Sequence, residues 1–124
     1  MITKLVFCVR KRADLSTEEF LDYWLNRHGP LVRSLWEAGT FPGMLRYVQS
    51  HTVLDADGGR RARGTKAPYD GITEVWMDSE LGATDATTRA ASAAGGTRLL
   101  EDEATFIDFA ESCVFVTTEH VIFG

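Results

Sequence analysis

The sequence predicts an α+β protein of the ferredoxin-like order β-α-β-β-α-β, with one antiparallel four-stranded sheet and helices on a single face. Three observations favour this fold: four segments whose side chains alternate with a period of two, one long amphipathic helical stripe, and a later alanine-rich helical segment. The chain has 124 residues, of which 44% are hydrophobic and 25% are charged. We therefore expect residues 1–124 to form a single domain with one core.

The four strands are expected at residues 2–10, 44–54, 69–77 and 112–123. In the second segment, Tyr47, Gln49 and His51 share one face, and in the third segment Thr73 and Val75 share one face. Residues 55–68, between these two strands, are polar and rich in glycine and arginine, which is typical of a long loop.

The first helix has the strongest local signal in the chain. Ser16 and Glu19 have the spacing of a capping box. An apolar stripe follows at spacings of three and four, made of Phe20, Trp24, His28, Leu31 and Leu35. Because Pro30 lacks a backbone N–H, the pattern predicts one helix from about residue 17 to 36, bent near His28.

The second helical segment contains six alanines within residues 83–94. The pair Gly95-Gly96 is expected to end this helix, with a further helical turn or two over residues 97–103. This leaves one face of the sheet without helices. The side chains expected on that face are largely apolar, namely Val6, Val48, Ile72 and Trp76, which predicts a homodimer that packs sheet against sheet.

Composition and motifs argue against several classes of function. With 13 basic and 18 acidic residues the net charge is −5, which disfavours a nucleic-acid partner. No apolar run approaches the length of a membrane span and no signal peptide is recognisable, so a cytoplasmic protein is expected. Cys8 and Cys113 do not form a CxxC pair, the three histidines lack metal-ligand spacing, and no Walker or Rossmann glycine motif occurs. We expect no metal and no cofactor.

Four stretches of the sequence resemble the EthD-domain family of the dimeric α+β-barrel superfamily. They read KLVFCVRKRADLSTEEFLDYWLNRHGPLV, MLRYVQSH, YDGITEVWM and VFVTTEHVIF, and the most specific piece is YWLNRHGPLV at residues 23–32. The resemblance spans about residues 3 to 123. It implies a protomer whose sheet joins that of a second copy in a dimeric barrel. Relatives include lactone isomerases, dehalogenases, polyketide cyclases and decarboxylases, cofactor-free monooxygenases, and proteins with no assigned reaction.

His28 is the first candidate for catalysis, since its place in the apolar stripe turns it toward the sheet, where an imidazole can act as general acid or base. The structural alternative is a histidine that bonds a backbone carbonyl freed by Pro30. The resemblance implies a histidine near this place and a tyrosine on the second strand, which matches Tyr47. Tyr47 and Gln49 can donate hydrogen bonds to an enolate or phenolate oxygen, although Tyr47 can equally be a packed residue. His51, beside the basic loop, is as readily solvated as catalytic.

The expected cleft lies between the bent helix and the sheet. Its floor is expected from Leu5, Phe7, Val9, Thr73 and Val75, and its aromatic wall from Phe20 and Trp24. The resemblance places Thr73 and Val75 on the pocket side and Glu74 inside the barrel, where Lys4 or Arg46 is its expected partner. The cations of residues 60–66 form either a solvated loop or a guide for a carboxylate-bearing ligand, and Glu119 and His120 either close the dimer seam or reach a pocket.

These residues favour a cofactor-independent lyase or isomerase that acts on a small, apolar, oxygenated ring or polyketide-like compound, with His28 as acid–base residue. The reactions considered are cyclisation, dehydration, decarboxylation and lactone rearrangement. Two alternatives stay open: a non-catalytic protein that binds or shields a pathway intermediate, and a cofactor-free monooxygenase acting on an electron-rich phenol.

Overall fold

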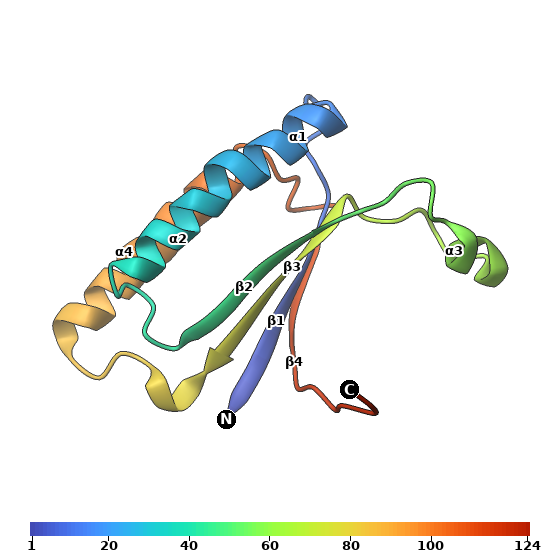
Figure 1. Cartoon of the computed structure of the whole chain (residues 1–124). Coiled ribbons are helices and arrows are strands. Elements are labelled where there is room, and N and C mark those ends of the chain that lie inside the picture. Colours follow the sequence, from blue (N-terminus) through green and yellow to red (C-terminus); the bar gives the residue numbers. More distant parts are fainter.

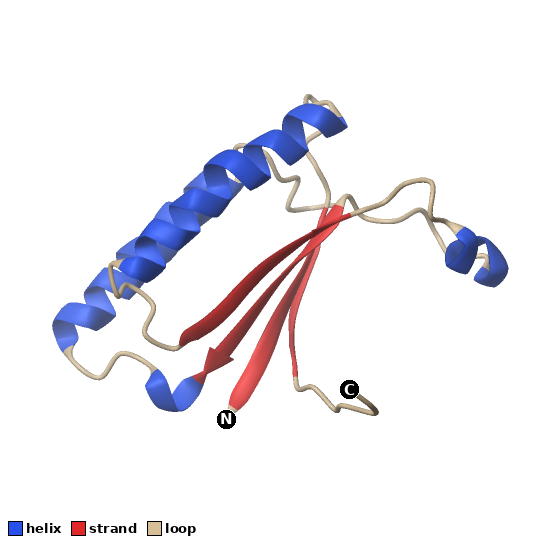
Figure 2. Ribbon diagram, viewed as in Figure 1, coloured by secondary structure: helices blue, strands red, loops and turns tan.

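A computed structural model, which describes residues 1–124, has a four-stranded antiparallel sheet covered on one face by helices (Figures 1 and 2). The predicted α+β, ferredoxin-like fold is confirmed, with the strands in the order β2-β3-β1-β4. The strands are β1 (Ile2–Val9), β2 (Met44–His51), β3 (Gly71–Asp78) and β4 (Cys113–Thr117). The helices are α1 (Thr17–Tyr23), α2 (Gly29–Glu37), α3 (Gly58–Arg63) and α4 (Ala86–Glu103), with a π-helical turn η1 (Trp24–His28) and a 3-10 turn η2 (Ser79–Leu81). None of these helices combines the length and apolar character needed to cross a membrane.

The first helix bends where the sequence predicts. Ser16 accepts a hydrogen bond from the Glu19 backbone N–H, and the Glu19 carboxylate accepts one from the Ser16 N–H, so the capping box is complete. One turn before Pro30 the helix widens into η1, in which the Gly29 N–H donates to the carbonyl of Trp24. Pro30 has no backbone N–H to donate to the preceding turn, and the widened turn lies directly before it. This turn ends at His28, and α2 follows without a break.

The helix after β3 does not end at the glycine pair. Instead, α4 continues through Gly95 and Gly96 to Glu103. The expectation of a helix stop is wrong. Gly95 instead allows Thr40 and Phe41 to approach the helix backbone closely, because a Cβ atom there would lie 2.6 Å from Cγ2 of Thr40 and 3.0 Å from Cζ of Phe41. A Cβ atom at Gly96 would meet nothing within 4 Å. One glycine of the pair therefore lets α4 pack against the segment that precedes β2.

Several strand boundaries and one loop also differ from expectation. β2 ends at His51, β3 begins at Gly71, and β4 covers only Cys113–Thr117, so the C-terminal residues that continue the alternation lie outside the sheet. The loop at residues 55–68 contains α3, which stands apart from the other helices in Figure 1. A bulge between Met44 and Arg46 displaces Leu45 from the pairing with β3.

The register divides the sheet into two chemically distinct faces. Val75 pairs with both Leu5 and Tyr47 on the helix-covered side. Val6 pairs with Glu74 and Phe115 on the side without helices. The closed core lies at one end of the helical layer and consists of Val9, Phe20, Trp24, Phe106 and Ile107.

The side without helices, here called the outer face, carries the ion pair expected for Glu74. Lys4 Nζ lies 2.7 Å from Glu74 Oε2 and also pairs with Glu119 at 3.5 Å. Arg46 stacks on the Trp76 ring at 4.7 Å. Apolar side chains surround this charged centre, and Phe115 and Ile72 are among the exposed large hydrophobic residues.

The two adjacent glycines of α4 allow a matched test of this packing. Gly95→Ala should destabilise the fold by about 1–3 kcal/mol, because its methyl group overlaps Thr40 and Phe41. Gly96→Ala should stabilise it by up to about 1 kcal/mol, because alanine favours a helix and the site is open. Urea unfolding of both variants measures the difference, and equal midpoints would refute the role given to Gly95.

Candidate functional site

An apolar cavity of about 460 Å³, here called the central cavity, lies between the helix-covered face of the sheet and the helices. The sheet contributes Leu5, Phe7, Thr73 and Val75 to its floor, and His28 and Glu103 belong to the helical side. The other lining residues are Trp24, Val32, Met44, Tyr47, Met77, Leu99, Leu100, Ile107, Phe109, Ser112, Cys113 and Val114. The volume is in the range of small-molecule sites. No lysine or arginine lines the cavity.

His28 is buried, with 4% of its surface exposed, and its ring is held by a carboxylate. Nδ1 lies 2.8 Å from Oδ2 of Asp102, near the end of α4. Because an ionised carboxylate only accepts hydrogen bonds, Nδ1 carries the proton of the neutral ring and the Nε2 lone pair is left for a ligand. Burial lowers the pKa of His28 below its ordinary value, against the opposing effect of Asp102. His28 is therefore a neutral base near pH 7.

Glu103 lies on the other side of the imidazole. Its Oε2 is 3.8 Å from His28 Nε2, too long for a direct hydrogen bond but short enough for both groups to reach one ligand atom. Burial, and then the charge of the adjacent Asp102, raises the pKa of Glu103 to about 7. A carboxyl group with this pKa exists in both forms at neutral pH, so it can donate or accept a proton.

Tyr47 and Gln49 form a pair on β2. The side-chain amide of Gln49 donates to the Tyr47 hydroxyl at 3.2 Å and to the Trp24 carbonyl at 2.8 Å, the same carbonyl that accepts from Gly29 in the π turn. Burial raises the pKa of Tyr47, so its hydroxyl keeps its proton at neutral pH. Tyr47 thus presents a hydrogen-bond donor at the wall of the central cavity.

Most of the predicted site residues meet at this cavity. His28, Tyr47, Phe7, Trp24, Thr73 and Val75 all line it. Gln49 reaches it only through Tyr47.

Three predicted residues lie elsewhere. Phe20 and Val9 are fully buried in the closed core, where Phe20 packs between Trp24 and Phe106, so Phe20 forms no wall of the cavity and Val9 no part of its floor. His51 stacks on Trp24 at 4.7 Å and lies within hydrogen-bond distance of Gln49, outside the cavity.

Sequence reasoning missed the acidic residues of the site. Asp102 accepts a hydrogen bond from the Tyr23 hydroxyl on one oxygen and pairs with His28 on the other, so the predicted backbone-carbonyl alternative for His28 does not hold. Glu103 is its neighbour. The available signal was an Asp-Glu pair ending a helical segment just before the apolar Phe106 and Ile107, which places carboxylates beside the core.

The remaining charged candidates lie away from this cavity. The arginines of α3 do not line it, and Glu119 binds Lys4 and Trp76 on the outer face. His120 is exposed. No three histidine, cysteine, aspartate or glutamate side chains converge as metal ligands would.

The raised pKa of Glu103 makes the stability of the fold depend on pH. The folded chain holds this proton more tightly than the unfolded chain, so the resulting stabilisation is complete below pH 4.5 and is lost as the pH rises through about 7. Compared with Glu103→Gln, the wild type should lose about 2–3 kcal/mol of unfolding free energy between pH 4.5 and 7.5. Urea unfolding at several pH values measures this, with Glu101→Gln as the control for loss of one exposed charge on the same helix. Parallel curves for wild type and Glu103→Gln would contradict the burial of this carboxyl.

Comparison with known proteins agrees with the architecture. The structure is similar to an EthD-family protein of Bacillus halodurans C-125, with a TM-score of 0.60 and 16% identity, over 97% of this chain and 100% of the other. It is also similar to a dimeric ferredoxin-like protein of unknown function from Bacteroides fragilis NCTC 9343, with a TM-score of 0.56 and 11% identity, over 93% of both chains. A third similar structure is a dimeric ferredoxin-like protein of unknown function from Thermobifida fusca YX, with a TM-score of 0.53 and 11% identity, over 96% of this chain and 92% of the other.

No curated protein matches the chain. The family model of the EthD domain matches residues 12–110, which include both helices of the site, His28 and the two carboxylates. The resemblance seen in the sequence is confirmed: the chain belongs to the EthD domain family.

Proposed function

We propose that this protein is a cofactor-independent lyase or isomerase that moves a proton on a small, mostly apolar, oxygenated compound. One observation carries the proposal: a neutral imidazole with its lone pair available and a carboxyl group of pKa about 7 lie 3.8 Å apart at the wall of an apolar cavity. Such a pair supplies a base and an acid at the same pH.

The step that the geometry supports is enolisation. His28 Nε2 takes a proton from the carbon next to a carbonyl group, and the electrons of that C–H bond form the C=C bond of the enol. The carbonyl oxygen gains negative charge, which the Tyr47 hydroxyl stabilises and the protonated Glu103 neutralises. The proton then returns to another carbon in an isomerisation, or a leaving group departs in an elimination.

The reacting compound is expected to be uncharged at the cavity. A buried anion requires a cationic partner, and no lysine or arginine lines this site. This disfavours the carboxylate-guiding role considered for the arginines of residues 60–66. Apolar lining residues and few polar groups suit a ring or polyketide-like compound with one or two oxygen atoms.

The proposal includes a homodimer that joins two outer faces. This face exposes apolar side chains around the Lys4–Glu74 pair and has no helix over it. Two of the similar structures are described as dimeric. Since the central cavity lies on the opposite side of the sheet, a dimer of this kind leaves the acid–base group accessible.

Exchange of carbon-bound protons tests the chemistry without knowledge of the natural substrate. We expect the wild type to accelerate deuterium uptake next to the carbonyl of 2-tetralone in D₂O, followed by proton NMR. His28→Ala and Tyr47→Phe should each slow the exchange by at least about tenfold, because they remove the base and the oxyanion donor. His120→Ala, at an exposed histidine, and Tyr69→Phe are matched controls outside the central cavity and should keep the wild-type rate.

The pH profile of the same exchange reaction distinguishes the contributions of His28 and Glu103. The rate should rise as His28 loses its proton, below pH 6.5, and should fall near pH 7 as Glu103 ionises. Glu103→Gln should abolish the fall at high pH. If the wild type binds 2-tetralone but does not accelerate the exchange, the chain is a binding protein and the catalytic proposal fails.

Sedimentation tests the dimer. The wild type should sediment as a dimer at micromolar concentration, and Phe115→Glu should give monomers because it buries a charge in the proposed interface. Leu54→Glu alters a more exposed hydrophobic residue that lies outside the strands and should leave the dimer intact. A monomeric wild type would exclude the proposed assembly.

A further inference from the structure

The two cysteines of the chain stand opposite each other in the sheet. Cys8 in β1 and Cys113, the first residue of β4, are register partners in the antiparallel ladder, and both thiols are free. Directly opposed side chains project from the same face of a sheet, with Cβ atoms about 4.5–5.5 Å apart. A disulfide needs Cβ atoms about 3.5–4.5 Å apart. Because β4 is an edge strand, a small movement of its first residue brings the two sulfur atoms to bonding distance.

The two thiols differ in accessibility. Cys113 is exposed, whereas Cys8 is half-buried. Burial, and next the neighbouring Cys113 thiol, raise the pKa of Cys8, so this thiol keeps its proton at neutral pH. A reagent that approaches from solvent therefore meets Cys113 first, with Cys8 beside it as the second thiol.

A hydroxyl group and positive charge lie beside Cys113. Its Sγ is 3.7 Å from the hydroxyl oxygen of Tyr69, and that oxygen accepts a hydrogen bond from Lys66 Nζ at 3.2 Å. The guanidinium of Arg10 lies 5.0 Å from the centre of the Tyr69 ring and 3.9 Å from Asp70, so Lys66 supplies the uncompensated charge. A Cys113 thiolate can accept a hydrogen bond from the hydroxyl, and the cation attracts an anionic reagent. Exposed, electropositive surroundings of this kind are typical of a reactive cysteine.

We propose that Cys8 and Cys113 form a thiol–disulfide exchange site, in which an anionic low-molecular-weight disulfide generates a cross-strand disulfide. The Cys113 thiolate attacks one sulfur of the reagent and displaces a first thiolate, which leaves a mixed disulfide on Cys113. Cys8 then loses its proton and attacks the Cys113 sulfur, which displaces the second thiolate. The cysteines lose two electrons, the reagent gains them, and the two released thiolates take up the two protons. This site does not depend on the catalysis proposed for His28.

The new bond acts on the border of the central cavity. Ser112, Cys113 and Val114 line that cavity, and β4 is paired with β1 alone. Oxidation fastens this border to β1 and closes nearly the whole chain into one loop, which restricts the unfolded state. The oxidised fold should therefore resist unfolding better than the reduced fold.

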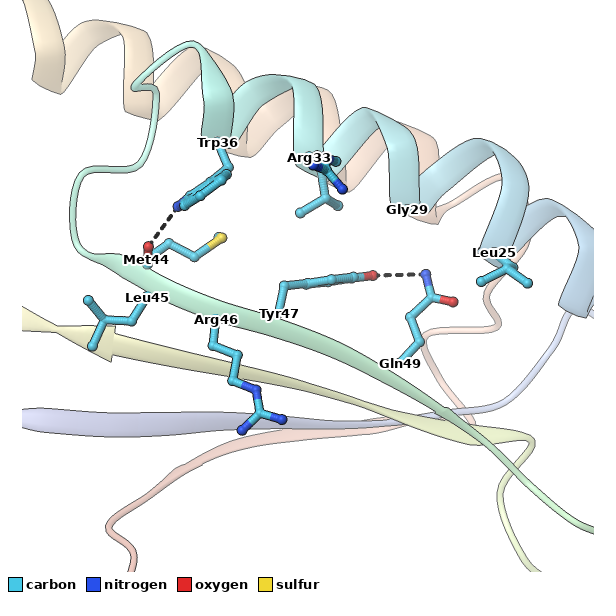
Figure 3. Close-up of a pocket in the computed structure, with 10 residues that line it drawn as sticks. Leu25, Gly29, Arg33, Trp36, Met44, Leu45, Arg46, Tyr47 and Gln49 are labelled. Carbon is cyan, nitrogen blue, oxygen red and sulfur yellow. Dashed lines mark hydrogen bonds between the residues drawn. The ribbon is translucent and has the colours of Figure 1, made fainter.

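A disulfide reagent acts on these thiols without altering the other sulfur atoms of the chain. Met44, for example, has an oxidisable thioether beside Trp36, in the space between α2 and β2 (Figure 3). Strong oxidants convert thioethers as well as thiols, whereas a disulfide exchanges with thiols only. Oxidised glutathione, which carries several carboxylates, is therefore the probe of choice.

Intact-mass spectrometry of the folded protein after incubation with oxidised glutathione tests the exchange. The wild type should lose two hydrogen atoms and retain no glutathione. Cys8→Ser should stop with one glutathione on Cys113, because no second thiol remains. Cys113→Ser should react at least about tenfold more slowly, since the remaining thiol is half-buried and protonated. Lys66→Gln should slow the wild-type reaction about twofold at low salt, but should not slow the reaction with cystamine, a cationic disulfide.

Urea unfolding checks that the bond closes the loop. The oxidised wild type should have a higher midpoint than the reduced wild type, and Cys8→Ser should show no such difference after the same treatment. A wild type that stays unreacted, retains glutathione or links two copies on a non-reducing gel would overturn the exchange site, and so would equal midpoints of the two wild-type forms. An equal effect of Lys66→Gln on both reagents would overturn the preference for an anionic one.

Discussion

The site depends on one buried interaction, the pairing of His28 with Asp102. A buried imidazole needs a hydrogen-bond partner, and this partner comes from a helix 74 residues further along the chain. The pair joins the π turn of the first helix to the end of α4, above the sheet. Tyr23 holds the second oxygen of Asp102, so both partners of the imidazole–carboxylate contact have restricted orientation. The direction of the free lone pair on Nε2 follows from that contact.

The two adjacent acidic residues at the end of α4 have different roles at the site. Asp102 faces the protonated side of the imidazole, whereas Glu103 faces the unprotonated side and the cavity. Burial affects the two ionisable groups of the cavity in complementary directions, because it lowers the pKa of His28 and raises that of Glu103. Both shifts arise because burial in an apolar space disfavours the charged form of a group. As a result, the cavity contains a base and an acid at the same pH.

Periodicity and capping chemistry sufficed to predict the fold, and together with the family resemblance they predicted half of the site. Alternation put Thr73 and Val75 on one face of their strand, the resemblance assigned that face and Tyr47 to the pocket, and the stripe of the first helix directed His28 toward the sheet. Asp102 and Glu103 could not be found in this way, because their proximity to His28 depends on how far α4 continues. α4 continues through its glycine pair, where Gly95 allows close packing against Thr40 and Phe41, whereas a glycine pair in isolation equally indicates a helix end. Phe20 shares the stripe with Trp24, yet only packing with Phe106 decides that it belongs to the closed core.

The central claim concerns the state of one imidazole ring, which can be observed directly. Long-range nitrogen–proton correlation NMR of the labelled protein, recorded across a pH titration, reports which ring nitrogen of His28 carries the proton and at what pH the second proton binds. We predict a neutral ring protonated on Nδ1 at pH 7, which becomes charged only below pH 6.5. A ring protonated on Nε2 at pH 7, or one already doubly protonated there, would contradict the account.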